Sequence, residues 1–399
     1  MGTFTHLRKT KKSVILASKI STMVITGGGI LVIVAVLGIL LFLIAVVIPL
    51  FQGAKVNPST SYKLPLRDAD LLFAEVDEYQ SLGVVLSRNG TLTAFHASTG
   101  EKIFEEELIT TGAEVTAFSR TLRGGHTALG LANGEIFLGN LSFKLSFLEE
   151  EKIPENFKNL NVGTPVIFEK GILERTSEGL FRKVEVNVDF ASPVRMGTSE
   201  APVVLIDYRP LEDQNEVGVG LKADGQLLLN KIKRKKNLLT GKVTTSLDKR
   251  EIPYELPRDP QAVSALLSNL LLNSRGDQLY LAWKDGTLHR YDLRDLKNPV
   301  AAEKMNVVQP GATDNEQRTL SQLKFMIGDQ SLISADSSGN IIAWFRVEKG
   351  SNARGSDGYE LVPVHILEKH RSAVSALAIS PRDKGLITAT SDGEIFLRC

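Results

Sequence analysis

Histidine and cysteine are the residue types that most often hold metal ions, and in this chain they are scattered. The six histidines show no His-x-His or His-x-x-x-His spacing of the kind that brings two imidazoles to one zinc ion. Cys399 is the sole cysteine, so neither an internal disulfide nor a cysteine-based metal site can form. The sequence therefore predicts no metal centre and no cofactor. The histidines are His6, His96, His126, His289, His365 and His370.

Carboxylates and hydroxyls give no catalytic pattern either. Asp-Gly is a turn sequence in which the aspartate side chain caps the turn, so we interpret the Asp-Gly aspartates as local caps and not as a catalytic pair. The serines in strand-like segments lack the Gly-x-Ser-x-Gly setting of an esterase nucleophile, and no phosphate-binding Gly-x-x-x-x-Gly-Lys-[Ser/Thr] motif occurs. These features predict a protein that is not an enzyme. The residues concerned are Asp224, Asp285, Asp392, Ser119, Ser264 and Ser375.

The densest charge in the chain is basic and includes Lys231, Lys233, Arg234, Lys235 and Lys236. Against anionic lipid headgroups each such residue would contribute about 1 kcal/mol. The alternative, which we favour, is a solvated loop inserted between two repeats. Residues 1–55 hold six basic and no acidic residues, so the rest of the chain is mildly acidic. Such a body is poorly suited to neutralising phosphates, which argues against a nucleic-acid partner.

The elements that would position these residues repeat along the chain. Residues 370–399 read as two strands, the tight turn Ser391-Asp392-Gly393 and a third strand, which is typical of one blade of a WD40-type β-propeller. In that pattern His370 opens the repeat and bonds within its own blade. Six similar hairpins precede it at intervals of roughly 45 to 60 residues, which predicts an all-β, seven-bladed WD40-like β-propeller. The turn glycines are Gly90, Gly134, Gly179, Gly225, Gly286, Gly339 and Gly393.

Inner strands are expected ahead of several hairpins. Residues 115–119, 263–266 and 320–325 share the alternating pattern of residues 374–377. His126, in a Gly-Gly-His sequence, is expected in a loop. The last blade ends after its third strand, so either residues 62–66 supply its outer strand or that strand lay in a longer parent chain.

The N-terminal region predicts one membrane span. Residues 23–51 are almost wholly apolar, and about 20 such residues suffice for a helix to cross a bilayer. A cleaved signal peptide would have a shorter apolar core followed by a small-x-small cleavage site, which is not found. We predict a basic tail over residues 1–20, an uncleaved transmembrane helix over 21–52, a linker over 53–61 and the propeller over 62–399.

Charge sets the expected orientation of this span. Five basic residues precede it and only Lys55 follows closely, so the positive-inside rule places the N-terminus in the cytoplasm and the propeller in the periplasm of a bacterial cell. Gly27, Gly28 and Gly29 near the start of the span fit either a helix-packing surface or a flexible entry, of which we favour the second.

The exit of the span reads Val47-Ile48-Pro49-Leu50-Phe51-Gln52-Gly53-Ala54. With the basic tail and the propeller-like repeats, it resembles the N-terminal part of long-form PstC-type phosphate ABC transporter permeases. In that family a WD40-like domain is inserted between the first and second membrane helices. Transport there depends on later membrane helices and on a cytoplasmic loop that docks the ATPase, neither of which this sequence contains. No transport residue is therefore carried over, and the chain is expected to be a fragment or split-gene product.

The resemblance implies a non-catalytic accessory domain of a phosphate permease, anchored in the bacterial inner membrane by a single span. Its expected partners are the permease core and the periplasmic phosphate-binding protein, with the ligand-binding residues unknown. Two alternatives stay open. One is a stand-alone membrane-anchored propeller that acts as a scaffold or envelope assembly factor. The other is a propeller enzyme, which would need convergent acids or a metal site near the central channel.

Overall fold

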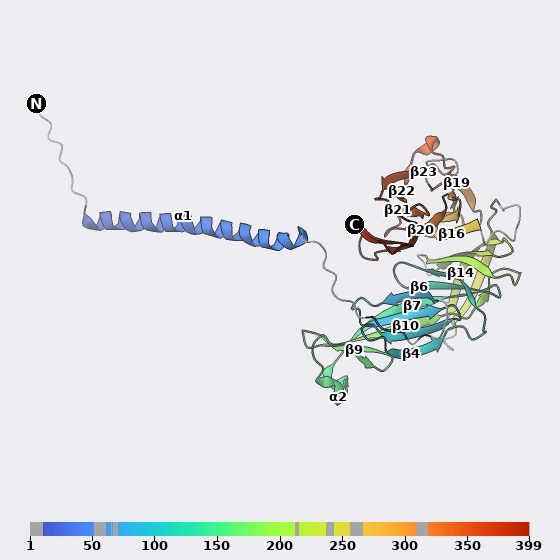
Figure 1. The fold of residues 1–399 in the computed structure, drawn as a ribbon, viewed down its shortest axis with the longest axis horizontal. Helices are drawn as coiled ribbons and strands as arrows, with labels where there is room; N and C mark the ends of the chain where they lie inside the picture. The colour runs from blue at the N-terminus through green and yellow to red at the C-terminus, as the bar shows by residue number, and fades with distance from the viewer. Residues whose placement is uncertain are drawn as a thin grey trace, which may run out of the picture. The chain divides into compact units, whose positions relative to one another are not determined.

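The computed structural model describes residues 11–51, 61–64, 66, 71–211, 215–236, 243–255, 266–308 and 318–398. The chain divides into two compact units, Met1–Ser61 and Tyr62–Cys399. One long helix dominates the first unit, whereas the second is built almost entirely of β-strands (Figure 1).

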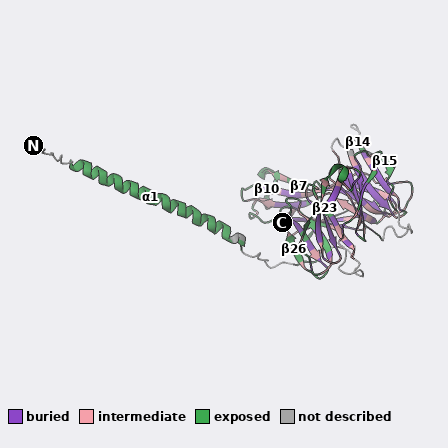
Figure 2. Ribbon diagram, turned by 90° about the horizontal axis from the view of Figure 1, so that it is seen from above, coloured by how far each residue is buried: buried purple, intermediate pink, exposed green. Residues whose placement is uncertain are grey.

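Helix α1 (Lys12–Val47) continues into the short 3₁₀ helix η1 (Ile48–Phe51). It is exposed along its whole length (Figure 2) and is long and apolar enough to cross a membrane. It begins earlier than the predicted residue 21, because backbone hydrogen bonding continues through lysine, serine and alanine residues that an apolar window leaves out. The three glycines at positions 27–29 are regular helical residues within α1.

The second unit contains six antiparallel sheets among its described residues, here named A to F in chain order. Sheets A, C, D and E have four strands each, and successive strands along the chain are neighbours. Sheet A comprises β1 (Leu71–Val76), β2 (Leu82–Ser87), β3 (Thr91–His96) and β4 (Lys102–Glu107). Sheet C comprises β12 (Val203–Pro210), β13 (Asn215–Lys222), β14 (Leu227–Lys236) and β15 (Val243–Glu251).

Sheet D comprises β16 (Leu267–Leu272), β17 (Gln278–Trp283), β18 (Thr287–Asp292) and β19 (Val300–Asn306). Sheet E comprises β20 (Leu320–Phe325), β21 (Ser331–Asp336), β22 (Ile341–Glu348) and β23 (Tyr359–Ile366), with the 3₁₀ helix η5 (Gly350–Asn352) before β23. Sheet F has three described strands, β24 (Val374–Ile379), β25 (Leu386–Thr390) and β26 (Ile395–Arg398).

Sheet B is larger, with seven strands. Its main path is β5-β6-β7-β10-β9-β8, and β11 pairs separately with β7. The 3₁₀ helix η2 (Glu150–Lys152) and helix α2 (Glu155–Lys158) lie between β7 and β8. The strands are β5 (Val115–Arg120), β6 (His126–Leu131), β7 (Glu135–Leu148), β8 (Val166–Phe168), β9 (Gly171–Arg175), β10 (Phe181–Phe190) and β11 (Val194–Arg195).

The prediction of seven blades is wrong, because the hairpin at Gly179 does not form a sheet of its own. Strand β7 is 14 residues long and leaves a free edge, along which β10 pairs from Phe181 opposite Leu148 to Phe190 opposite Gly139. The segment also lacks an inner strand, since only the three-residue β8 lies between β7 and β9. The hairpins at Gly134 and Gly179 therefore share sheet B.

The first strands of neighbouring sheets lie side by side, in the order β5, β12, β16, β20 and β24. Buried apolar clusters lie between sheets A and B, B and C, C and D, D and E, and E and F. An ion pair between Arg382 and Glu78 joins sheet F to sheet A. Radial sheets with their first strands at the centre and apolar layers between them define a β-propeller.

The predicted inner strands at residues 115–119, 320–325 and 374–377 are confirmed as β5, β20 and β24. Residues 263–265 lie outside the described part of the chain, and the inner strand of sheet D is β16. The prediction that residues 62–66 add an outer strand to the last blade is not met by the described residues 61–64 and 66, which lie in no strand. Instead the Tyr62 hydroxyl donates to the Ala97 carbonyl beside sheet A, at 2.5 Å.

Candidate functional site

The Asp-Gly turns behave as local structures. All seven predicted turn glycines have a positive φ, between 77° at Gly134 and 89° at Gly393. The backbone N–H groups of Gln226 and Thr287 donate to Asp224 and Asp285, which confirms the predicted capping at these two turns. Asp392 differs, since it accepts hydrogen bonds from the hydroxyls of Ser372 and Thr390. The side-chain oxygens of these three aspartates therefore accept hydrogen bonds from residues in or beside their turns.

His370 lies fully buried in sheet F, with 1% of its surface exposed. Its Nδ1 hydrogen-bonds Glu394 at 2.8 Å and its Nε2 hydrogen-bonds the Thr388 hydroxyl at 2.7 Å. The predicted structural role within its own blade is confirmed. The hydrogen bond from His370 holds the pKa of Glu394 below its usual range.

The other four described histidines belong to four different sheets and do not converge. His96 hydrogen-bonds the Pro165 carbonyl, His289 packs against the Trp283 ring and His365 against Phe345. His126 is not in a loop but opens β6, because it pairs with Asn140 on β7. His6 lies outside the described residues. The described residues contain no group of three His, Cys, Asp or Glu side chains able to hold a metal ion.

The strand serines make hydrogen bonds within the fold. Ser119 donates to Asp207, a carboxylate that also accepts from the backbone N–H groups of Tyr208 and Leu272. Ser375 donates to the Ala389 carbonyl at 3.3 Å. Ser264 lies outside the described residues. Asp207 thereby ties the first strands of sheets B, C and D together.

A buried lysine at the end of β13 was not foreseen from the sequence. The Lys222 side chain is fully enclosed, and its Nζ donates to both the carbonyl and the hydroxyl of Ser199 at 2.6 Å. The Ser199 hydroxyl donates in turn to Asp224 at 2.5 Å. Burial lowers the pKa of Lys222. An amine next to a serine hydroxyl is the arrangement of a Ser-Lys nucleophile. Here the Lys222 amine is buried, so no substrate can reach it. The hydrogen bonds from Lys222 to Ser199 and from Ser199 to Asp224 instead hold the Asp224 turn in place.

The second unforeseen group is a buried ion network between sheets D and E. The guanidinium of Arg290 on β18 pairs with Glu303 at 3.2 Å and with Asp357 at 2.5 Å, and all three side chains are at most 4% exposed. Arg354 and Arg346 lie at the same carboxylates, at 3.3 and 3.8 Å. No sequence motif marks this cluster, because its members come from strands β18, β19 and β22 and from the segment between η5 and β23. Its charges are paired with one another, as buried charges must be.

The basic segment is not an inserted loop as predicted, since Lys231 to Lys236 form the end of β14 and pair with β15. Side chains along a strand point alternately to its two faces, and within this segment Ile232 points into the core, where it is fully buried. Burial of Ile232 favours the pairing of β14 with β15 here. Lys231 is half-buried opposite Asp248, and Lys233 is exposed opposite Ser246. The side chains of residues 234–236 lie outside the described part. Lys231 and Lys233 thus lie on an interior strand of sheet C, between β13 and β15.

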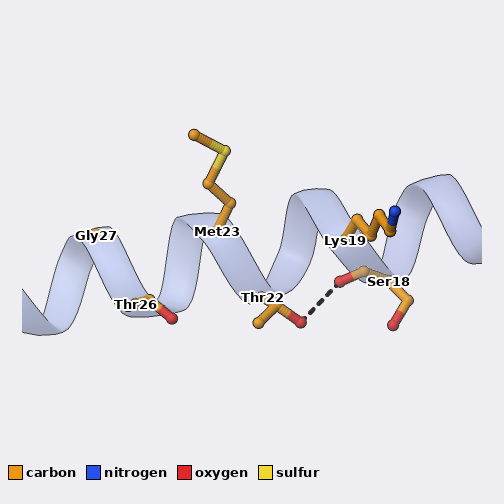
Figure 3. Close-up of a pocket in the computed structure, with 6 residues that line it drawn as sticks. All are labelled: Ser18, Lys19, Thr22, Met23, Thr26 and Gly27. Carbon is orange, nitrogen blue, oxygen red and sulfur yellow. Dashed lines mark hydrogen bonds between the residues drawn. The ribbon is translucent and has the colours of Figure 1, made fainter.

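Two depressions on the described surface could hold a small molecule only if their lining residues offered suitable groups. The first lies on α1 and is lined by residues of that helix alone (Figure 3). Thr22 donates to the Ser18 carbonyl there, so the one polar contact shown is within the helix. The second is lined by residues 108–111, Phe137 and residues 190–193, none of which is titratable. The first depression has a single titratable side chain, Lys19, and the second has none.

No protein-family model matches this chain, and no curated protein matches it. Among solved structures it is similar to the β-propeller domain of Cps50 (Swd1) from Myceliophteria thermophila. The two share 11% identity, with 83% of this chain and 96% of that chain covered and a TM-score of 0.40. A likeness at this level supports no functional inference. The sheets themselves show that this protein is a β-propeller, and one apolar helix precedes it in the chain.

Proposed function

We propose that this chain is a membrane-anchored interaction protein without catalytic activity. The observation that carries the proposal is the combination of a single helix able to cross a bilayer with a propeller in a separate unit. Propellers offer broad, rigid faces to binding partners. The Asp-Gly aspartates, the described strand serines and His370 all make hydrogen bonds within the fold, which also favours a binding role.

The proposed partner is a PstC-type phosphate ABC transporter permease, to which this chain adds an accessory domain. The support is the resemblance of the span exit from Val47 to Ala54, combined with the propeller after it. The proposed location is the bacterial inner membrane, with the N-terminus in the cytoplasm and the propeller in the periplasm, because the basic residues precede the span. The periplasmic phosphate-binding protein is the second proposed partner.

Affinity purification tests the partner. Full-length tagged chain would be solubilised from membranes in mild detergent, beside a control that ends at Ser61 and keeps only the helix. We expect permease subunits or the phosphate-binding protein to co-purify with the full chain and not with the control. Recovery of no transporter component would count against the phosphate assignment.

Thiol labelling tests the orientation. Cys399 is the only cysteine, so a membrane-impermeant maleimide has one target, and a Cys399→Ser variant is the blank. After the outer membrane is permeabilised, we expect labelling of intact cells. Labelling that requires lysis of the inner membrane, with the thiol reactive in the folded protein, would place the propeller in the cytoplasm.

A stand-alone scaffold is the second candidate, and the compact propeller unit, separate from the helix, is the observation that favours it. It predicts that purification recovers other envelope proteins in place of transporter components. The two candidates share the anchored, non-catalytic propeller and differ only in the partner.

A further inference from the structure

Sheet F differs from the other sheets in the exposure of one of its faces. In sheets A to E, the residue two positions after the hairpin glycine is buried against the next sheet, with at most 1% exposed. The equivalent residue of sheet F is Ile395, which is 68% exposed. Ile387 (45%) and Leu397 (73%) share its face, because they pair with each other across β25 and β26. The buried equivalents of Ile395 are Leu92, Ile136, Leu227, Leu288 and Ile341.

The first strand of sheet A shows the complementary exposure. In sheets B to F, the first strand carries apolar residues at positions i and i+3, and a register shift after residue i puts both on one face. Residue i is at most 4% exposed in these five strands. Strand β1 has the same register shift after Leu71 and the same spacing to Ala74, but Leu71 is 49% exposed and Ala74 is exposed as well. The buried equivalents of Leu71 are Val115, Val203, Leu267, Leu320 and Val374.

A loop contact holds sheet F next to sheet A. Arg382, in the loop between β24 and β25, forms an ion pair with Glu78, in the loop between β1 and β2. The neighbouring sheets D and E are linked through the equivalent loops, because the backbone N–H of Ser274 donates to Asp329. Sheets F and A therefore meet at their loops as neighbouring sheets of a propeller do, although their apolar faces are exposed.

We propose that β1 packs on the exposed face of sheet F, which closes the ring of sheets at a sixth apolar interface, and that the ring opens and closes at this seam. Closure removes Leu71, Ile387, Ile395 and Leu397 from water, which favours the closed state. The inference goes beyond the proposed function, because it concerns the propeller whatever partner is bound.

The interface between sheets B and C indicates which residues meet in the closed state. There Val203 lies against Gly130, so that a Cβ on Gly130 would lie 2.7 Å from the Val203 Cβ. Gly130 stands four positions before its hairpin glycine, and the residue at that position in sheet F is Ala389. In the closed state Leu71, the equivalent of Val203, therefore lies against Ala389.

A second copy of the chain is the competing occupant, since it carries the same β1. Within one chain, however, two contacts keep the loops of sheet F at sheets A and B. One is the Arg382–Glu78 ion pair, and the other is the 2.7 Å hydrogen bond from Arg123 Nε to the Pro381 carbonyl. Segments held together in this way have effective concentrations of about 1 mM, far above the concentration of a second copy in a dilute sample.

Disulfide trapping tests the closed state in the full-length protein in mild detergent. Cys399, the only cysteine, is first replaced with serine so that only introduced thiols react. The test protein carries Leu71→Cys/Ala389→Cys and is treated with a mild oxidant. Non-reducing gels and mass spectrometry then distinguish a disulfide within one chain from one between two chains.

Two cysteine pairs in the same background serve as controls. Ala335→Cys/Val374→Cys occupies the equivalent positions of the covered interface between sheets E and F and is the positive control. Leu71→Cys/Val300→Cys joins β1 to an exposed residue of sheet D and is the negative control.

We expect the test pair to form its disulfide within one chain about tenfold or more faster than the negative control. Reaction no faster than the negative control, while the positive control reacts, would overturn the proposal. So would disulfides that join two chains, because the occupant would then be a second copy.

Thiol protection gives a second measurement that needs no trapped state. The reporter is Ile395→Cys, again with Cys399 replaced by serine, and its rate of reaction with a maleimide is measured. Adding Leu71→Asp, which puts a charge on the packing face of β1, should raise this rate about tenfold. The matched control, Leu145→Asp at an exposed site on β7, should leave the rate unchanged. Equal rates with and without Leu71→Asp would refute closure by β1. Both measurements use the isolated protein, so they stand or fall independently of the proposed transporter partner.

Discussion

Replacing Arg290 with methionine should destabilise the propeller where sheets D and E meet. The change removes the guanidinium from two carboxylates that are 1% and 4% exposed, those of Glu303 and Asp357. It also removes the 3.0 Å hydrogen bond to the Tyr359 carbonyl. Methionine keeps much of the volume, so loss of charge pairing dominates over loss of packing.

The size of the effect follows from the remaining partners. Removing one member of a buried ion pair typically costs about 3–5 kcal/mol, because the other charge stays buried. Here Arg354 remains 3.3 Å from Glu303, and Arg346 remains 3.8 Å from Asp357. The free energy of unfolding should therefore fall by an amount near the lower end, about 3 kcal/mol.

Tryptophan fluorescence during urea unfolding is a suitable assay, because the only two tryptophans lie in the joined sheets. Trp283 belongs to β17 in sheet D, and the buried Trp344 belongs to β22 in sheet E. The control is Arg294→Ala, which breaks an ion pair with Asp292 whose arginine is 63% exposed and should cost at most about 1 kcal/mol.

An Arg290 variant that loses no more stability than the control would show that the buried ion pairs do not stabilise the propeller. A second comparison isolates the charge effect. In a background with Glu303→Gln and Asp357→Asn, the buried negative charges are gone, so the added cost of Arg290→Met should shrink. An undiminished cost would mean that shape, not charge, is what Arg290 contributes.

Three further predictions concern the turns and sheet F. Replacing His370 with alanine should lower the free energy of unfolding by about 1–3 kcal/mol, because the buried Thr388 hydroxyl loses its imidazole partner; an unchanged urea midpoint would contradict this. The folded-state pKa of Glu394 is depressed, so its stabilising contribution is complete above the ordinary glutamate pKa and is lost as pH falls through the lower folded value. Urea midpoints measured against pH should show this loss in the unchanged protein and not in Glu394→Gln. Gly339→Ala should cost more than Gly179→Ala, since both glycines have φ above 80° but only at Gly339 would the new Cβ lie 2.5 Å from the His370 carbonyl oxygen. Equal urea midpoints would show that the clash is relieved.

Features set by neighbouring residues were predictable from the sequence. The turn glycines were found because a tight turn needs a positive φ that glycine accepts, and all seven adopt it. The long apolar helix was found because its composition alone marks it. His370 was assigned correctly, because its partners Thr388 and Glu394 lie within the same short repeat.

Features that depend on distant residues were not predictable. The number of blades was wrong because β10 could pair with the free edge of β7 or belong to a sheet of its own, and both choices satisfy the same alternation. The buried charges of Lys222 and Arg290 were missed for the same reason. Arg290 meets Asp357 across 67 residues of chain, and nothing near either residue indicates that they meet.

Leu288 and Ile395 illustrate what the sequence determines by itself and what only the tertiary structure determines. Both follow a hairpin glycine by two positions and both are aliphatic, so the sequence by itself determined that each lies on a strand and faces one side of a sheet. Only the tertiary structure decided that Leu288 is 1% exposed and Ile395 is 68% exposed. The physical reason is that backbone geometry and side-chain alternation are set by adjacent residues, whereas burial depends on which distant segment packs against the face.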